Sequence, residues 1–133
     1  MRLQQIFSRV AIFAAMIASA PIAFGAEISV AGKAEVEQLL SRLAASDCQF
    51  NRNGSWYSPA EARDHLNRKF QYAVDKKLLS SADDFISLIG TKSSSSGTAY
   101  AVKCGNGTAA QPSAEWLSAE LRKLRANKIA VAK

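Results

Sequence analysis

The sequence predicts a single α+β domain in which about four helices pack on a small antiparallel sheet. Apolar residues recur at helical spacing in several stretches, and two short stretches between them alternate apolar and polar residues. Length gives the third indication. The chain has 133 residues, of which the first 25 have the composition of a removable leader. The remaining 108 residues suffice for one domain and not for two.

Residues 1–25 have the layout of a secretory signal peptide. Two arginines and no acid precede an apolar run over residues 10–20, and small residues flank the expected cleavage between Gly25 and Ala26. Spanning a bilayer takes about 20 apolar residues, and this run is roughly half as long, so a retained membrane anchor is the weaker alternative. We therefore predict that the protein is exported and that the mature chain does not span the membrane.

The predicted mature domain begins with a flexible segment, residues 26–32, and its core covers residues 33–127. Apolar residues at i, i+3, i+4 and i+7 predict a first helix from residue 33 to about residue 46. Ser58 with Glu61 matches a capping box, and Pro59 suits the first position of a second helix. Ser81 with Asp84 repeats the pattern before a short third helix. The last helix is expected from about residue 112.

The two alternating stretches predict the sheet. Residues 48–57 alternate on either side of Asn53-Gly54, two residues that tolerate the positive φ angles of a two-residue hairpin turn. Residues 98–104 alternate again and predict a further, half-buried strand. Loops of small polar residues connect these strands to the helices.

Cys48 and Cys104 are the two cysteines of the chain. In an oxidising compartment an even number of cysteines indicates a disulfide, which here would join the first strand to the last. A zinc site is the alternative, but the cysteines and the lone His65 supply at most three soft ligands without a C-x-x-C pair. We expect a disulfide, and no metal or other cofactor.

Positive charge concentrates at the C-terminus. Removing the leader lowers the net charge from +6 to +4, and the charged residues after Glu120 are all basic: Arg122, Lys123, Arg125, Lys128 and Lys133. Residues 128–133 form a basic tail that could make weak contact with an anionic surface such as phospholipid. Alternatively, the cations simply favour a helix C-terminus and stay hydrated. Specific nucleic-acid binding is not predicted.

A series of residues in this order is similar to a known family. The series is Arg52-Asn53-Gly54, Glu61-Ala62, His65-Leu66, Lys69, Ala82, Phe85-Ile86, Ser93-Ser94, Ser96-Gly97, Tyr100 and Val102-Lys103. It resembles the YfeK-like family of small exported bacterial proteins, a domain of unknown function, over roughly residues 35–124. The resemblance implies a periplasmic, one-domain protein and brings no activity, cofactor or catalytic residue.

The residues that can carry chemistry indicate a binding site more than a catalytic one. His65 is the only histidine, and a small hydrolase could use it with Glu61 or a loop serine. No Gly-x-Ser-x-Gly motif presents a serine, however. The serine loop, residues 92–97 with the sequence Lys-Ser-Ser-Ser-Ser-Gly, could instead hold an anion through its amides and hydroxyls, or serve only as a flexible connection. The candidate ligand-binding residues are Arg52, His65, Ser93, Ser94 and Ser96.

The sequence thus predicts a non-enzymatic binding or accessory protein of the bacterial envelope. Its partner would be another envelope protein or a small ligand. The two alternatives are the small hydrolase and an interaction protein that acts through its basic tail.

Overall fold

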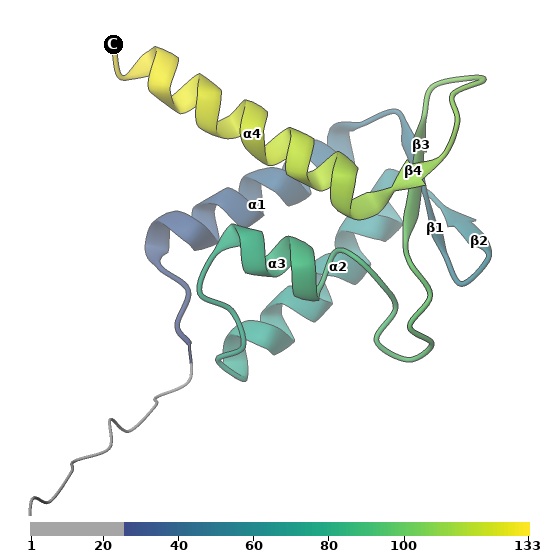
Figure 1. The fold of residues 1–133 in the computed structure, drawn as a ribbon, viewed down its shortest axis with the longest axis horizontal. Helices are drawn as coiled ribbons and strands as arrows, with labels where there is room; N and C mark the ends of the chain where they lie inside the picture. Colours follow the sequence, from purple (N-terminus) through teal and green to yellow (C-terminus); the bar gives the residue numbers. More distant parts are fainter. Residues whose placement is uncertain (1–25) are drawn as a thin grey trace, which may run out of the picture.

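A computed structural model describes residues 26–133, so the predicted signal peptide and its Gly25 boundary lie outside the described residues. The chain forms α1 (Val30–Ala45), β1 (Cys48–Arg52), β2 (Ser55–Tyr57), α2 (Pro59–Asp75), α3 (Ala82–Leu88), β3 (Ala101–Cys104), β4 (Gln111–Pro112) and α4 (Ser113–Val131). The four strands form one antiparallel sheet in the order β2-β1-β3-β4. Figure 1 shows the helices gathered to one side of this small sheet. The predicted α+β class is confirmed.

The local signals at the hairpin and at α2 act as predicted. Asn53 and Gly54 both have positive φ angles, and β1 pairs with β2 on either side of them. The Ser58 hydroxyl accepts a hydrogen bond from the amide of Glu61, and the Glu61 carboxylate accepts one from the amide of Ser58. This capping box fixes the start of α2, and therefore which of its side chains face the sheet.

Both ends of the helical region extend further than the sequence predicted. α1 begins at Val30, within the segment expected to be flexible, because the Ser29 hydroxyl caps the helix by accepting from the amide of Gly32. At the other end, α4 continues to Val131, so most of the predicted basic tail is helical. The end of α4 projects away from the body of the domain in Figure 1.

The edge of the sheet also differs from the prediction. β3 begins at Ala101, and Ala99 forms only an isolated bridge with Lys92. β4 was not predicted at all. It has two exposed residues that pair with Ala101 and Val102, and two residues are too few to show a strand period.

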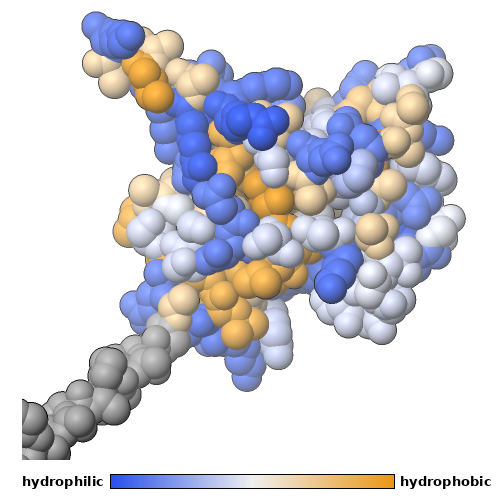
Figure 2. All heavy atoms as spheres, viewed as in Figure 1, coloured by the Kyte–Doolittle hydropathy of each residue, from blue (hydrophilic) through white to orange (hydrophobic). Residues whose placement is uncertain are grey.

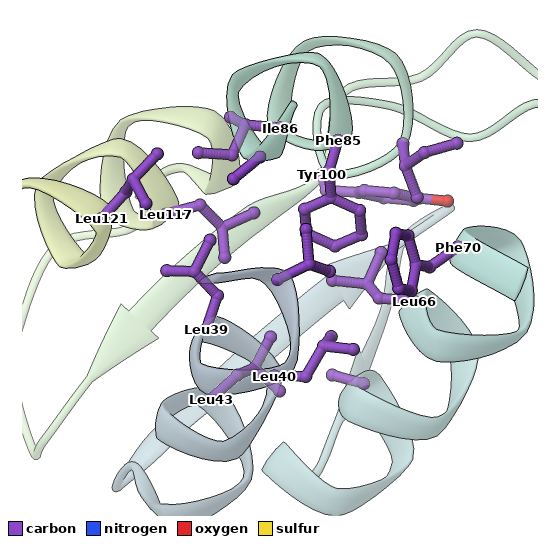
Figure 3. Packing of buried hydrophobic residues seen from close by; sticks show 14 of the residues in the cluster. Leu39, Leu40, Leu43, Leu66, Phe70, Phe85, Ile86, Tyr100, Leu117 and Leu121 are labelled. Carbon is purple, nitrogen blue, oxygen red and sulfur yellow. The ribbon is translucent and has the colours of Figure 1, made fainter. Parts of the chain in front are cut away.

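One hydrophobic core joins all four helices to the inner face of the sheet. Figure 3 shows leucines of α1, Leu66 and Phe70 of α2, Phe85 of α3 and Leu117 of α4 converging on it. Phe70 and Phe85 pack edge to face with ring centroids 5.6 Å apart. The apolar surface visible in Figure 2 lies mainly over the helices. No helix within residues 26–133 is both long and apolar enough to cross a membrane.

The predicted disulfide is present between Cys48 and Cys104. The two cysteines are direct partners across β1 and β3, with their Cα atoms 3.9 Å apart. The bridge therefore closes one end of the central strand pair.

Candidate functional site

A cavity of about 260 Å³ lies between α2 and the sheet, at the end of the strand pair opposite the disulfide. Phe50 and Tyr57 of the sheet and Ala62 and Leu66 of α2 supply its apolar lining. Its polar lining includes Arg52, His65, Tyr100 and Ser113. The cavity thus combines an apolar wall with a small set of polar groups, as ligand sites commonly do.

Strand alternation and helix spacing bring these groups together. Side chains alternate along β1, so Arg52 lies on the same face as Phe50 and faces α2. Pairing of Asn51 with Ala101 places Tyr100 across from Arg52. On α2, His65 and Lys69 are one turn apart and face the same side.

A chain of hydrogen bonds connects four of these side chains. Arg52 Nη1 lies 2.8 Å from His65 Nδ1 and 3.5 Å from Nε2. His65 Nε2 lies 3.1 Å from the Tyr100 hydroxyl, and Lys69 Nζ lies 3.1 Å from the same hydroxyl. Because arginine can only donate, Nδ1 must be the acceptor nitrogen of a neutral imidazole. His65 therefore carries its proton on Nε2 and donates it to Tyr100.

The surroundings of His65 keep its imidazole neutral at pH 7. Burial lowers the pKa of His65, and the positive charges of Arg52, Lys69 and Arg68 lower it further, to about 4. A proton on Nδ1 would also replace the hydrogen bond from Arg52 with a repulsive contact. The basic nitrogen of His65 is thus occupied by a cation, which disfavours a role as general base.

Lys69 joins α2 to the segment before β3. Its ammonium donates to the carbonyl oxygens of Ile89 and Lys92, at 3.0 and 3.1 Å, and to the Tyr100 hydroxyl. Its pKa is lowered by burial and by the charge of Arg52. These three acceptors use all three protons of the ammonium, so Lys69 holds the wall of the cavity in place.

The predicted serine residues lie beside the cavity and not in its lining. Ser96 Oγ donates to Asn53 Oδ1 at 2.6 Å, and Asn53 Nδ2 donates to Ser93 Oγ at 3.4 Å. These contacts dock the loop on the hairpin turn next to Arg52. Ser93 is buried, whereas Ser94 is exposed. Among the described residues, His65 is not hydrogen-bonded to any of the loop serines.

Glu61, the other partner considered for His65, is committed to the start of α2. Its carboxylate accepts a hydrogen bond from the Ser58 amide at 2.9 Å. This bond, and a second one from the Ser58 side chain, lower the pKa of Glu61.

The structure thus brings together Arg52 and His65 from the predicted set. Sequence reasoning missed Tyr100, Lys69 and Ser113 as parts of the site. The alternation of residues 98–104 places Tyr100 on the same face as Val102 and could have indicated it. Ser113, by contrast, resembles an ordinary residue at a helix start.

Two cations of the C-terminal region are already engaged. Arg125 bonds Glu35 of α1 and Asp83 of α3, with contacts at 2.8 Å to each. Lys123 pairs with Glu120 at 2.8 Å. Arg125 thus ties α4 to α1 and α3, and Lys123 pairs within α4. Both contacts leave less free charge for an anionic surface than the sequence indicated.

Within residues 26–133, the one cluster with potential metal ligands joins Asp47 to the two cysteines. Their sulfurs are bonded to each other, so the oxidised protein offers no thiolate ligand there.

Comparison with known proteins places the chain in a family. A family model described as a family of unknown function (DUF5329) matches residues 30–125, which is nearly all of the folded domain. The chain belongs to this family. No curated protein and no solved structure gives a significant match. The resemblance to the YfeK-like family and the exported bacterial origin stay predictions.

Proposed function

We propose that the protein is an exported, non-catalytic binding protein of the bacterial envelope that holds a small ligand in the cavity between α2 and the sheet. The observation that carries the proposal is the hydrogen-bonded chain from Arg52 through His65 to Tyr100 along the wall of this cavity. Fixed polar groups beside an apolar wall orient a ligand without further rearrangement.

The bonding of the polar groups supports binding over hydrolysis. His65 is neutral and has both ring nitrogens engaged, and the Glu61 carboxylate caps α2. A serine hydrolase needs a base within hydrogen-bond reach of its nucleophile. The loop serines bond Asn53 and one another.

Two features support export. The first is the composition of residues 1–25, and the second is the disulfide, because such bonds persist mainly in oxidising compartments. Cell fractionation tests this part. We expect a shortened, oxidised chain in the periplasmic fraction, and a full-length, reduced chain in the cytosol would contradict it.

A cavity-blocking variant tests the binding function. Ala62 is buried and lines the cavity, so Ala62→Phe places a ring in the ligand space; Ala60→Phe puts the same ring on an exposed part of α2. The proteins are incubated with small-molecule extract, washed and analysed by mass spectrometry. We expect a compound retained by the wild type and by Ala60→Phe but lost from Ala62→Phe, with all three folded by circular dichroism. Equal retention by all three, or by none, would contradict a binding role for the cavity.

A further inference from the structure

Hydrogen-bond donors along the cavity are left unused by the protein. Arg52 has five N–H groups, and among the described residues only its Nη1 has a hydrogen-bond partner, His65. The Tyr100 hydroxyl accepts from His65 Nε2 and from Lys69, so its own proton has no acceptor within residues 26–133. Both groups line the cavity.

Ser113 adds a third donor from a different element. Its residue is 1% exposed, and its hydroxyl has no hydrogen bond to a described residue. Yet no fully buried side-chain oxygen or nitrogen of the described residues lacks a partner. The hydroxyl is therefore the part of Ser113 that remains open, and Ser113 lines the cavity. The hydroxyl is thus available to a ligand or a water molecule in the cavity.

Ser113 is also the first residue of α4, a helix of 19 residues. Pro112 at the N-cap provides no side-chain acceptor. The Ser113 amide donates to the Tyr100 carbonyl oxygen, and the following amides of the first turn have no capping side chain. The positive end of the helix dipole accordingly lies at the cavity, where it favours a negatively charged group.

The cations beside the cavity are not paired with carboxylates of the described residues. Among the described residues, none of Arg52, Arg68 and Lys69 forms an ion pair. The two acids in the lining keep their charges but bond to other groups: the Glu61 carboxylate accepts from the Ser58 amide, and Asp64 pairs with Arg63. Close to His65 the charges of Arg52, Lys69 and Arg68 prevail, and together with burial they lower the pKa of that residue.

The size and the apolar wall limit what can enter. Drug-sized ligands occupy sites of about 300–1,000 Å³, and this cavity holds about 260 Å³. Phe50, Tyr57, Ala62 and Leu66 form an apolar wall that a hydrated inorganic ion would not use.

We infer that the ligand of this cavity is a compact organic carboxylate, held by the guanidinium of Arg52 and the hydroxyls of Tyr100 and Ser113, with its apolar body against Phe50 and Leu66. The planar guanidinium matches a carboxylate in two parallel hydrogen bonds. Tyr57 supports that plane, because the Arg52 guanidinium carbon lies 4.8 Å from the centre of the Tyr57 ring. The inference rests on the proposed binding function and specifies its ligand class.

Benzoate and benzamide test the inference because they share a ring and differ in charge. The disulfide-bonded protein from cells expressing the full chain is titrated with each compound and with inorganic phosphate, and amide chemical shifts are followed by NMR. We expect benzoate to shift the signals of Arg52, His65 and Ser113 and to bind at least tenfold more tightly than either of the other two compounds.

Three variants identify the groups that hold the carboxylate. Arg52→Gln is expected to weaken benzoate binding at least tenfold and to leave benzamide binding within twofold. Ser113→Ala removes one buried hydroxyl and should weaken benzoate binding about threefold to tenfold, as expected for one hydrogen bond. Arg122→Gln removes an exposed arginine of α4 outside the cavity lining and should change nothing.

Each contrary result has a distinct meaning. Equal affinity for benzoate and benzamide at the cavity would overturn the carboxylate inference and keep the binding function. Phosphate binding as tight as benzoate would overturn the organic part of the inference. Chemical-shift changes confined to residues outside the cavity would overturn both proposals. So would the absence of binding by all three compounds, if Ala62→Phe also retains the same compounds from the extract as the wild type.

Discussion

The two ends of the β1–β3 strand pair differ in how their side chains are connected. At one end Cys48 and Cys104 are joined covalently, and Cys48 is buried in the core. At the other end Arg52 and Tyr100 meet through His65, a polar connection that borders a cavity. The disulfide end has no unused hydrogen-bonding group in this connection. At the polar end, by contrast, N–H groups of Arg52 and the hydroxyl proton of Tyr100 have no acceptor among the described residues. Under the proposed function, the disulfide end supplies stability and the polar end supplies the groups that bind the ligand.

Removing the disulfide should give the largest effect. The bridge closes a separation of 56 residues in sequence, and replacing both cysteines by alanine should lower the free energy of unfolding by about 2–4 kcal/mol. Denaturant unfolding measures the change. A reducing agent should lower the stability of the wild type and leave that of the double variant unchanged. Equal sensitivity of the two proteins to reductant would show that the bridge is not the stabilising element at this end.

Tyr100→Phe should give the second largest effect, at the polar end. The substitution keeps the ring and removes the acceptor of both Lys69 and His65 Nε2–H, which should cost about 1–3 kcal/mol of unfolding free energy. Tyr72→Phe is the matched control, because Tyr72 is exposed on α2; its effect should stay within about 0.5 kcal/mol. Equal effects of the two substitutions would mean that the hydroxyl of Tyr100 does not hold this end together.

Acid should weaken the polar end before it affects the rest of the fold. The pKa of His65 is about 4 when folded and 6.5 when unfolded, so between these values the unfolded chain binds more protons and stability falls as pH falls. Allowing for the partial exposure of the ring, the loss should be about 1–2 kcal/mol. In the variant His65→Gln, this loss of unfolding free energy between pH 6.5 and 5 should be absent. Carboxyl groups with lowered pKa, such as Glu35 and Glu120, add a further loss only below about their ordinary value of 4.5.

Arg52→Gln should have the smallest effect on stability, because it removes a cation that lies beside Lys69 and His65 without a carboxylate partner. We expect a change within about 0.5 kcal/mol in denaturant unfolding. The same substitution should raise the pKa of His65, which NMR can follow directly because the chain has one histidine. An unchanged pKa together with a large loss of stability would make Arg52 a structural residue like Arg125, and not a group kept for a ligand.

Features decided by neighbouring residues were predictable from the sequence. The Asn53-Gly54 turn needs only two residues that accept positive φ, and the capping box needs only Ser58 and Glu61. Helical periodicity likewise indicated the apolar face of α1. The disulfide followed from a cysteine count and a compartment, and it agrees with the register of the two strands.

The site depends on contacts between residues distant in sequence, so the sequence could name only part of it. Arg52 and His65 were candidates because of their side-chain chemistry, but the 2.8 Å contact between Arg52 Nη1 and His65 Nδ1 depends on how α2 lies over β1. Ser113 is separated from His65 by 48 positions and reaches the cavity only because the two-residue strand β4 places the start of α4 beside Tyr100.

By itself, the sequence determined the class of fold, the turn, the starts of α2 and α3 and the cysteine pair, because each depends on local geometry or on composition. The tertiary structure alone decided which donors face one cavity and which tautomer His65 adopts. The physical reason is that hydrogen bonding and charge at a site depend on distances across the fold, and these are set only when the helices pack on the sheet.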